Sequence, residues 1–328
     1  MSLQRQPMKR KTAAAKRAPG STPGKSSPAK IHPVIIYPFA PPKDFSNLEE
    51  LYRLVARLDK DRDTYARPIT VMDRKTLQLK SPNPKFQKFR ASVVSRHSDI
   101  LDDWCVDTCQ MWYTGLGAAF DRGTCDDVYW LIPGDFNYGS TIGQEVLGRL
   151  HDLPEICVEL RQDICIGEIA TDHNHPKQLI DTYGTFALLY NWFPVAAQEI
   201  RQFTERPRSE FFALRGDFLQ ELLHQRWYAY EQTVVMLLDA VRTRRRISRF
   251  FVGNICDLPA GRESMTAAMQ QVERAERVMK SVWRARHEHQ PNWFEKFRQL
   301  ERRSEQIRHG AITILHNLLT GNPARRRD

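Results

Sequence analysis

Short apolar runs alternate with amphipathic stretches along the first half of the chain. Runs rich in β-branched residues at 32–39, 69–72 and 128–132 predict strands, and each run stops at a proline or an aspartate. Between them, apolar residues recur every three or four positions in 47–58 and again in 98–120, which predicts a helix in each stretch. This alternation of strands and helices predicts an α/β fold with a doubly wound, mostly parallel sheet.

The second half of the chain is predicted to be mainly helical, with short strands between the helices. A Pro-containing basic loop is expected at 80–90, before this half begins. The strands are expected at 164–166 and 211–214. Helices are expected at 147–153, within 177–192, and at 217–241, 263–290 and 293–319.

Changes in composition divide the chain into four parts. Residues 1–30 carry eight Lys or Arg and no acid among Pro, Gly and Ser, so we expect a disordered basic tail. Residues 31–260 are expected to form the sheet domain, and 261–322 a C-terminal helical extension packed on it. Residues 323–328 form a second basic tail.

The positive charge belongs to the two tails. The whole chain has a formal net charge of +10, and the tails account for all of it, so the body is balanced. Basic tails favour weak contact with an anionic membrane or with nucleic acid, whereas a balanced body argues against a dedicated nucleic-acid reader.

The length of the apolar stretches and the spacing of the cysteines bear on where the protein is located and on the redox state of its thiols. No apolar stretch reaches the roughly 20 residues that span a bilayer, and no secretory signal is recognisable. The six cysteines form no CxxC pair, so we expect reduced thiols, with a zinc site at Cys105 and Cys109 as an open alternative. We therefore expect a cytoplasmic protein, with peripheral contact to a membrane left open.

Acidic residues follow several of the predicted strands. Asp44 lies in the loop after the first strand, Asp73 ends the second, Asp135 follows the strand at 128–132, and Glu168 follows the strand at 164–166. The carboxyl ends of parallel strands meet at one edge of a sheet, so these acids are expected to form one rim. Carboxylate oxygens suit Mg²⁺ or Mn²⁺ bridging a diphosphate, although each acid alone is equally well explained as a helix cap or an ion-pair partner.

Two further groups of residues carry candidate chemistry. The polar segment 171–177 offers His173 or His175 as a metal ligand and Lys177 as a phosphate ligand, or it is an ordinary surface turn. Glu210, Asp217 and Glu231 lie among aromatic residues that either line an acceptor pocket or belong to the core, and desolvation there would make such an acid a candidate general base. The chain has no P-loop, no GxGxxG after a strand and no HExxH, which argues against kinases, dehydrogenases and zincins.

The order of elements over 32–240 resembles the GT-A fold of nucleotide-sugar glycosyltransferases, especially the family that contains polyprenyl-phosphate mannose synthases. In that family a first strand ends in a Pro-containing loop, here Val-Ile-Ile-Tyr-Pro (34–38), and a second ends in an acid, here Ile-Thr-Val-Met-Asp (69–73). A helix with small residues (115–119) then leads to the strand at 130–135, where the family has Asp-x-Asp. Pro133 takes the place of the first acid, which leaves Asp135 alone. The last similarity is Asp-Ile-Cys-Ile-Gly-Glu at 163–168.

The resemblance implies a donor site for a nucleotide-diphosphate sugar. It implies that Pro38, Asp44 and Asp73 lie at the nucleotide, that Asp135 holds the metal or the diphosphate, and that Glu168 lies at the donor or acceptor edge. The acceptor is unknown, and a lipid-linked acceptor fits the family.

Three classes of function remain open from the sequence. The first is a glycosyltransferase that uses Mg²⁺ or Mn²⁺. The second is a nucleotidyltransferase-like or non-catalytic nucleotide-sugar-binding protein, which the missing acid of Asp-x-Asp favours. The third is a helical interaction protein with a nucleic-acid-binding basic tail.

Overall fold

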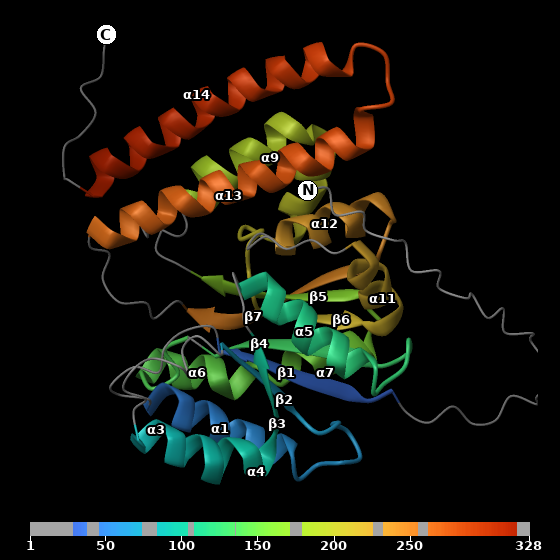
Figure 1. Ribbon diagram of the computed structural model, residues 1–328, viewed down its shortest axis with the longest axis vertical. Helices are drawn as coiled ribbons and strands as arrows, with labels where there is room; N and C mark the ends of the chain where they lie inside the picture. The colour runs from blue at the N-terminus through green and yellow to red at the C-terminus, as the bar shows by residue number, and fades with distance from the viewer. Residues whose placement is uncertain are drawn as a thin grey trace, which may run out of the picture.

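One mixed sheet forms the centre of the molecule (Figure 1). The computed structural model describes residues 29–37, 46–73, 84–103, 108–134, 136–170, 179–225, 232–254 and 262–319. Within these ranges, seven strands pair in the order β3-β2-β1-β4-β6-β5-β7. The strands are β1 (Ile31–Tyr37), β2 (Ile69–Asp73), β3 (Asp99–Asp103), β4 (Val128–Pro133), β5 (Ile164–Ala170), β6 (Phe212–Arg215) and β7 (Ile247–Asn254).

The sheet is parallel except for one strand. β1, β2, β3 and β4 pair in parallel, and β5 and β7 also pair in parallel. β6 lies between β4 and β5 and runs antiparallel to both. The predicted α/β fold with a mostly parallel sheet and C-terminal helices is therefore confirmed.

Helices cover both faces of the sheet. They are α1 (Ser46–Leu58), α3 (Pro84–Phe89), η1 (Arg90–Val94), α4 (Ser95–His97), α5 (Thr108–Phe120), α6 (Thr141–Arg149), α7 (Asp152–Glu159), η2 (Ile180–Phe186), α9 (Ala187–Trp192), α10 (Pro194–Phe203), α11 (Gly216–Gln225), α12 (Gln232–Arg242), α13 (Arg262–His287) and α14 (Trp293–Leu319). In Figure 1, α1, α3 and α4 lie below the sheet, whereas α9, α12, α13 and α14 lie above it.

Alternate residues of the strands supply two separate cores. Val34 and Ile36 of β1 face a core shared with α5, α9, α11, α12 and α13, whereas Ile31 and Ile35 face a core shared with α1, α3, α6 and α7. Each residue of β4 is buried. A central strand covered on both faces explains the continuous apolar run at this position in the sequence.

Gly115 lets α5 approach the sheet closely. A Cβ atom at this position would lie 2.6 Å from a methyl group of Val34 and 2.7 Å from a methyl group of Val71. The glycine at 115 is therefore explained by packing of α5 on β1 and β2, whereas a Cβ at Gly117 would meet no atom within 4 Å.

The helix predicted at 98–120 is wrong in its first part. Residues Asp99–Asp103 form the strand β3, and the helix α5 begins only at Thr108. β3 pairs with the edge of β2, and ion pairs from Arg67 and Arg122 to Asp99 hold its first residue. Pairing with β2 outweighs the helical periodicity of so short a segment.

The basic loop predicted at 80–90 is also wrong over its described residues. Pro84 starts the helix α3, a position where the missing N–H of proline costs nothing. Phe86 and Phe89 of this helix are buried, and Phe89 contacts the ring of Tyr52 edge-on at 5.7 Å. The burial of these two rings therefore favours a helix, although the prolines in this segment predicted a loop.

Several elements of the second half differ from the prediction. The stretch expected as one helix near 147–153 is two helices, α6 and α7. The helix expected at 217–241 is described as α11 and α12, with 226–231 outside the described residues. β7 and α10 were not predicted. For β7, the arginine-rich run before the strand hides its apolar pattern.

α13 and α14 form a hairpin that packs on α9 and η2 (Figure 1). The apolar stripe predicted on the first of these helices is buried at Val272, Met279 and Trp283. Glu276 lies on the same helix and is also buried, and it pairs with Lys280 at 2.9 Å and with Arg308 of α14 at 2.7 Å. An ionic contact between the two helices thus accompanies their apolar packing.

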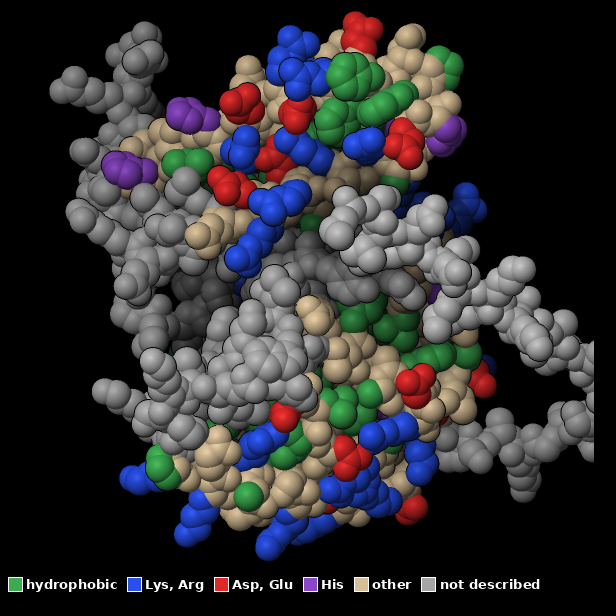
Figure 2. Space-filling model, viewed as in Figure 1, with side chains coloured by type: hydrophobic (Ala, Val, Ile, Leu, Met, Phe, Trp, Pro, Cys, Tyr) green, Lys and Arg blue, Asp and Glu red, His purple; other side chains and the backbone are tan. Residues whose placement is uncertain are grey.

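The surface in the view of Figure 2 is mixed in charge. Lys and Arg side chains gather at its lower end, over α1, α3 and α4, with Asp and Glu among them. None of the described helices has the length and apolar character needed to cross a membrane.

Candidate functional site

The carboxyl ends of the parallel strands meet at one edge of the sheet, which we call the carboxyl edge. β1 ends at Tyr37, β2 at Asp73, β4 at Pro133 and β5 at Ala170, and all four strands run in the same direction. Asp73 is therefore at this edge, where its backbone pairs with that of Asp103. In open α/β sheets ligands bind beyond this edge, so the candidate site is sought here.

Several residues predicted for the site lie outside the described residues. The side chain of Asp73 is not described, although its backbone is. The residues of which nothing is described are Pro38, Asp44, Asp135, His173, Lys177 and Glu231. Their roles stay predictions.

Glu168 on β5 is the predicted site residue whose side chain is described at the carboxyl edge. Its Oε1 accepts a hydrogen bond from the backbone N–H of Glu205 at 3.1 Å, and the Thr204 side chain also hydrogen-bonds the carboxyl. Its Oε2 is buried and has no hydrogen-bond partner among the described residues. Burial raises the pKa of Glu168, against the lowering effect of these hydrogen bonds and of the nearby Arg206.

Close to Glu168, two arginines surround a buried carboxylate. Asp181 of η2 is 1% exposed, and it accepts hydrogen bonds from Arg206 Nε at 3.3 Å and Arg208 Nε at 2.8 Å. Both arginine side chains are largely buried. One of these two guanidinium groups, that of Arg206, is close enough to Glu168 to lower the pKa of its carboxyl.

The segment that carries these arginines reaches the carboxyl edge because β6 runs antiparallel. The residues before β6 must then lie where its neighbours β4 and β5 end. Ser209 Oγ donates to the carbonyl oxygen of Gly167 at 2.8 Å, and the N–H of Gly167 donates to the carbonyl oxygen of Phe211 at 2.7 Å. Glu210, one of the acids predicted among the aromatic residues, lies between these two anchors, so its backbone is at this edge.

Gly167 allows this close approach of the segment to β5. A Cβ atom at this position would lie 2.6 Å from Cβ of Phe211. Phe211 is buried and packs edge-on against Phe136, with ring centroids 5.3 Å apart. These contacts fix the backbone on both sides of Glu210.

Asp217 lies at the opposite edge of the sheet and is not brought together with Glu168. Its backbone N–H donates to the carbonyl oxygen of Cys125, just before β4 begins. Its carboxylate is held by Arg215 at 2.8 and 2.9 Å and by Arg245 at 3.0 Å. These hydrogen bonds, chiefly from Arg215, lower the pKa of Asp217 to about 2, so it is a weak proton acceptor.

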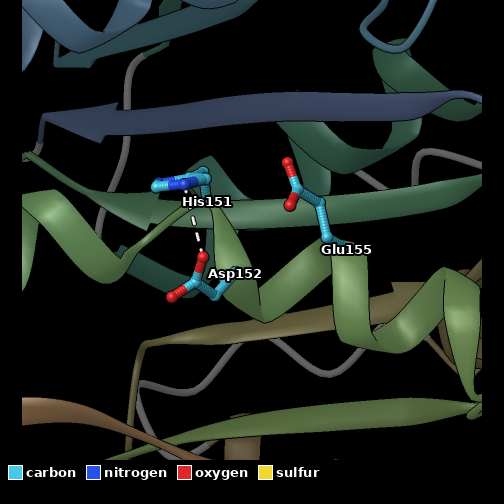
Figure 3. Close-up of side chains that lie close together, drawn as sticks. All are labelled: His151, Asp152 and Glu155. Carbon is cyan, nitrogen blue, oxygen red and sulfur yellow. Dashed lines mark ion pairs between the residues drawn. The ribbon is translucent and has the colours of Figure 1, made fainter.

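A group of possible metal ligands lies away from the carboxyl edge (Figure 3). Among the described residues, ligand atoms of His151, Asp152 and Glu155 lie within 4.8 Å of one another. His151 Nε2 is 3.3 Å from Asp152 Oδ1, and the Tyr65 hydroxyl donates to Glu155 Oε1 at 2.6 Å. Tyr65 pairs with Ile31 at the start of β1, so the group belongs to the amino ends of the strands.

The comparisons with known proteins support a fold and no closer relation. No protein-family model and no curated protein sequence matches this chain. Solved structures do match. One is glucosyl-3-phosphoglycerate synthase from Mycobacterium tuberculosis in complex with Mn²⁺, uridine-diphosphate-glucose and phosphoglyceric acid, with a TM-score of 0.53 and 13% identity over 80% of this chain and 85% of that chain.

A second structure of the same synthase, with Mn²⁺, uridine-diphosphate and glucosyl-3-phosphoglycerate, has a TM-score of 0.52 and 13% identity over 81% of this chain and 86% of that chain. Both chains are thus covered over most of their length. At this low identity the likeness concerns the fold alone. Together with the strand order and the antiparallel β6, it shows that the chain has the GT-A fold of glycosyltransferases.

Proposed function

We propose that this protein is a glycosyltransferase that moves a sugar from a nucleotide-diphosphate sugar to an anionic acceptor. The observation that carries the proposal is the half-buried carboxyl of Glu168 at the carboxyl edge of a GT-A sheet, with one oxygen unpartnered among the described residues. Such an oxygen is able to accept a hydrogen bond from a ligand or a water, and its position at the edge where open α/β sheets bind ligands is what favours a substrate role.

The donor is assigned to the ends of β1, β2 and β4. Pro38, Asp44, Asp73 and Lys177 are proposed to contact the nucleotide and its phosphates. Asp135 and His173 are proposed to hold Mg²⁺ or Mn²⁺, which when bound would neutralise the leaving diphosphate. The structures with similar folds contain Mn²⁺ with uridine-diphosphate or its glucose ester, which supports the same donor class here.

Glu168 is proposed to act as the general base. An acceptor hydroxyl attacks the anomeric carbon, the bond from that carbon to the diphosphate oxygen breaks, and the hydroxyl proton moves to Glu168. A carboxyl whose pKa is raised by burial holds a proton better than an exposed one, which suits this role near neutral pH. Glu210 is an alternative base, because its backbone is fixed at the same edge.

The acceptor is proposed to be anionic because Arg206 and Arg208 bring two guanidinium groups to the edge that carries Glu168, and guanidinium groups bind phosphate and carboxylate well. Phosphoglyceric acid in the similar structure is an anionic acceptor of this kind. A polyprenyl phosphate would also carry the required charge, so the relation to polyprenyl-phosphate mannose synthases stays within this proposal.

Thermal shifts with a panel of nucleotide sugars, with and without Mn²⁺, test the donor. A ligand that binds only the folded state raises the melting temperature, by an amount that grows with its concentration above Kd. We expect a shift that needs both the metal and the nucleotide sugar. Asp135→Asn should abolish this shift and leave the melting temperature without ligand nearly unchanged. Unchanged binding together with lower stability would instead assign Asp135 to a cap.

Glu168→Gln tests the base, and Glu205→Gln is the matched control. Glu205 is exposed and adjacent, its backbone N–H donates to the carboxyl, and its own charge raises the pKa of Glu168 less than burial does. We expect Glu168→Gln to keep donor binding and to lower kcat by at least about 100-fold, within the range for general base catalysis. A control variant that loses as much activity would contradict the assignment. Donor binding without turnover on any phosphorylated acceptor would favour the non-catalytic alternative.

A further inference from the structure

A cavity of about 350 Å³ opens at the amino ends of β1, β2 and β4, at the opposite edge from Glu168. Its charged and titratable lining residues are Lys30, His32, Arg62, Tyr65, Arg67, Arg122 and Asp127. Cavities of this size are in the range that holds small organic ligands. The cavity is separate from the proposed donor and acceptor sites, so what it binds does not depend on the proposed function.

Ion pairs behind the lining hold its cations side by side. Arg67 and Arg122 share Asp99, through Arg67 Nε at 2.8 Å and Arg122 Nη1 at 2.6 Å. Arg62 and Arg67 share Asp59 in the same way, although neither Asp59 nor Asp99 lines the cavity. These ion pairs therefore hold a row of three guanidinium groups at the cavity in the absence of a ligand. The carboxylates of the pairs, Asp59 and Asp99, lie outside the lining.

The one carboxylate in the lining is already engaged by the protein. Asp127 accepts hydrogen bonds at 2.8 Å from the backbone N–H of Lys30 and of Thr124. Burial opposes its ionisation, but these backbone hydrogen bonds outweigh burial and lower the pKa of Asp127. Its carboxylate is thus stabilised by the protein itself. Four cations and this one carboxylate line the cavity, and Asp59, Asp99 and Glu155 contact lining residues from outside it.

The floor of the cavity is polar and uncharged. His32 is 5% exposed and stacks on Tyr129, with ring centroids 4.8 Å apart. Burial lowers the pKa of His32, although Asp127 opposes the change, so the imidazole is neutral at pH 7. A Cβ atom at Gly123 would lie 2.4 Å from the Tyr129 hydroxyl and 2.7 Å from His32 Nε2, so a glycine is needed to form this floor.

We infer that this cavity binds a small organic phosphate, with the phosphate at Lys30 and Arg122 and the polar body of the ligand over His32. Arginine recognises phosphate through paired N–H groups, and lysine adds a point charge. The cavity has room for more than an inorganic anion, which is why an organic phosphate is favoured. Lys and Arg side chains are visible among acids at the lower right of Figure 2, the part of the surface nearest to where β1 begins.

Isothermal titration of the full chain with AMP in EDTA tests this inference, because EDTA removes the divalent ion that the proposed donor site requires. The variants are Arg122→Gln and Lys30→Gln, both at exposed or half-exposed side chains, so the fold should survive. Arg53→Gln is the matched control, since Arg53 is 72% exposed on α1 and does not line the cavity. Inorganic phosphate is titrated in parallel.

We expect saturable binding of one AMP per chain, weakened at least about tenfold in each cavity variant, the scale of one charge-assisted hydrogen bond. Arg53→Gln and Glu168→Gln should bind AMP as the unmodified chain does. Absence of binding up to about 5 mM AMP, roughly the weakest affinity such a site would show, would overturn the inference. Equal affinity in the cavity variants would do the same, and so would inorganic phosphate binding as tightly as AMP.

Discussion

Asp181→Asn should strongly destabilise the fold because it leaves two largely buried cations without their anion. Arg206 and Arg208 are 12% and 7% exposed, and each donates Nε–H to the carboxylate. Removing one partner of a buried ion pair costs about 3–5 kcal/mol. Asparagine keeps one acceptor oxygen but has no charge, so we expect the unfolding free energy to fall by about this amount. In a chain of 328 residues that corresponds to a fall in melting temperature of about 4–7 °C.

Urea unfolding followed by tryptophan fluorescence measures this loss. Glu50→Gln is the control, because Glu50 pairs with the 72% exposed Arg53 and such a pair is worth about 1 kcal/mol or less. Asp181→Asn combined with Arg208→Gln should be less damaging than the sum of the single changes, since the second change removes one of the stranded charges. A loss below about 1 kcal/mol for Asp181→Asn, or strict additivity in the double variant, would refute the reasoning.

Two other changes test the fold at defined points. Asp217→Asn should lower the unfolding free energy at pH 6, and its difference from the unmodified chain should shrink as the pH falls from about 4 towards 2. The pKa of Asp217 is held at about 2, mainly by Arg215, so part of its stabilisation remains at pH 2 and the rest is lost only below that pH. Urea titrations at several pH values measure this, and a difference as large at about pH 2 as at pH 6 would contradict it. Gly143→Ala should lower the unfolding free energy by about 1–3 kcal/mol, because its Cβ would lie 1.9 Å from a backbone carbonyl oxygen of the preceding turn. On the same helix, a Cβ at Gly148 would meet no atom within 4 Å, so Gly148→Ala should be neutral or stabilising by up to about 1 kcal/mol. Equal melting temperatures for these two glycine variants would contradict the packing argument.

The central strands and long helices could be predicted because their local pattern agrees with their burial. The run at 128–132 is apolar throughout since β4 is buried on both faces, and the stripe on α13 lies against α9 and η2. β3 could not be predicted, because its residues also fit a helical periodicity. Only pairing with β2 and the ion pairs of Asp99 make it a strand. The conformation of such a short edge segment depends on residues far away in the sequence.

The candidate site was only partly predictable, because edge assignments depend on strand direction. Glu168 was expected at the carboxyl edge and lies there, since β5 follows the parallel pattern. Asp217 was expected in the same pocket and lies at the opposite edge, since it follows a strand that runs the other way. A sequence pattern gives the position of a strand and leaves its direction open, so acids placed by strand order alone can fall on either edge.

The reversal of β6 has a second consequence for the chemistry of the edge. The same change of direction that removes Asp217 brings in the segment before β6, with Arg206, Arg208 and Glu210. A wholly parallel sheet would present only carboxylates there and would suit a cation. The reversed strand adds two guanidinium groups to the edge that carries Glu168, which under the proposed function would favour a negatively charged acceptor. Strand direction, as well as the number of acids in the sequence, therefore determines which charged groups this edge presents.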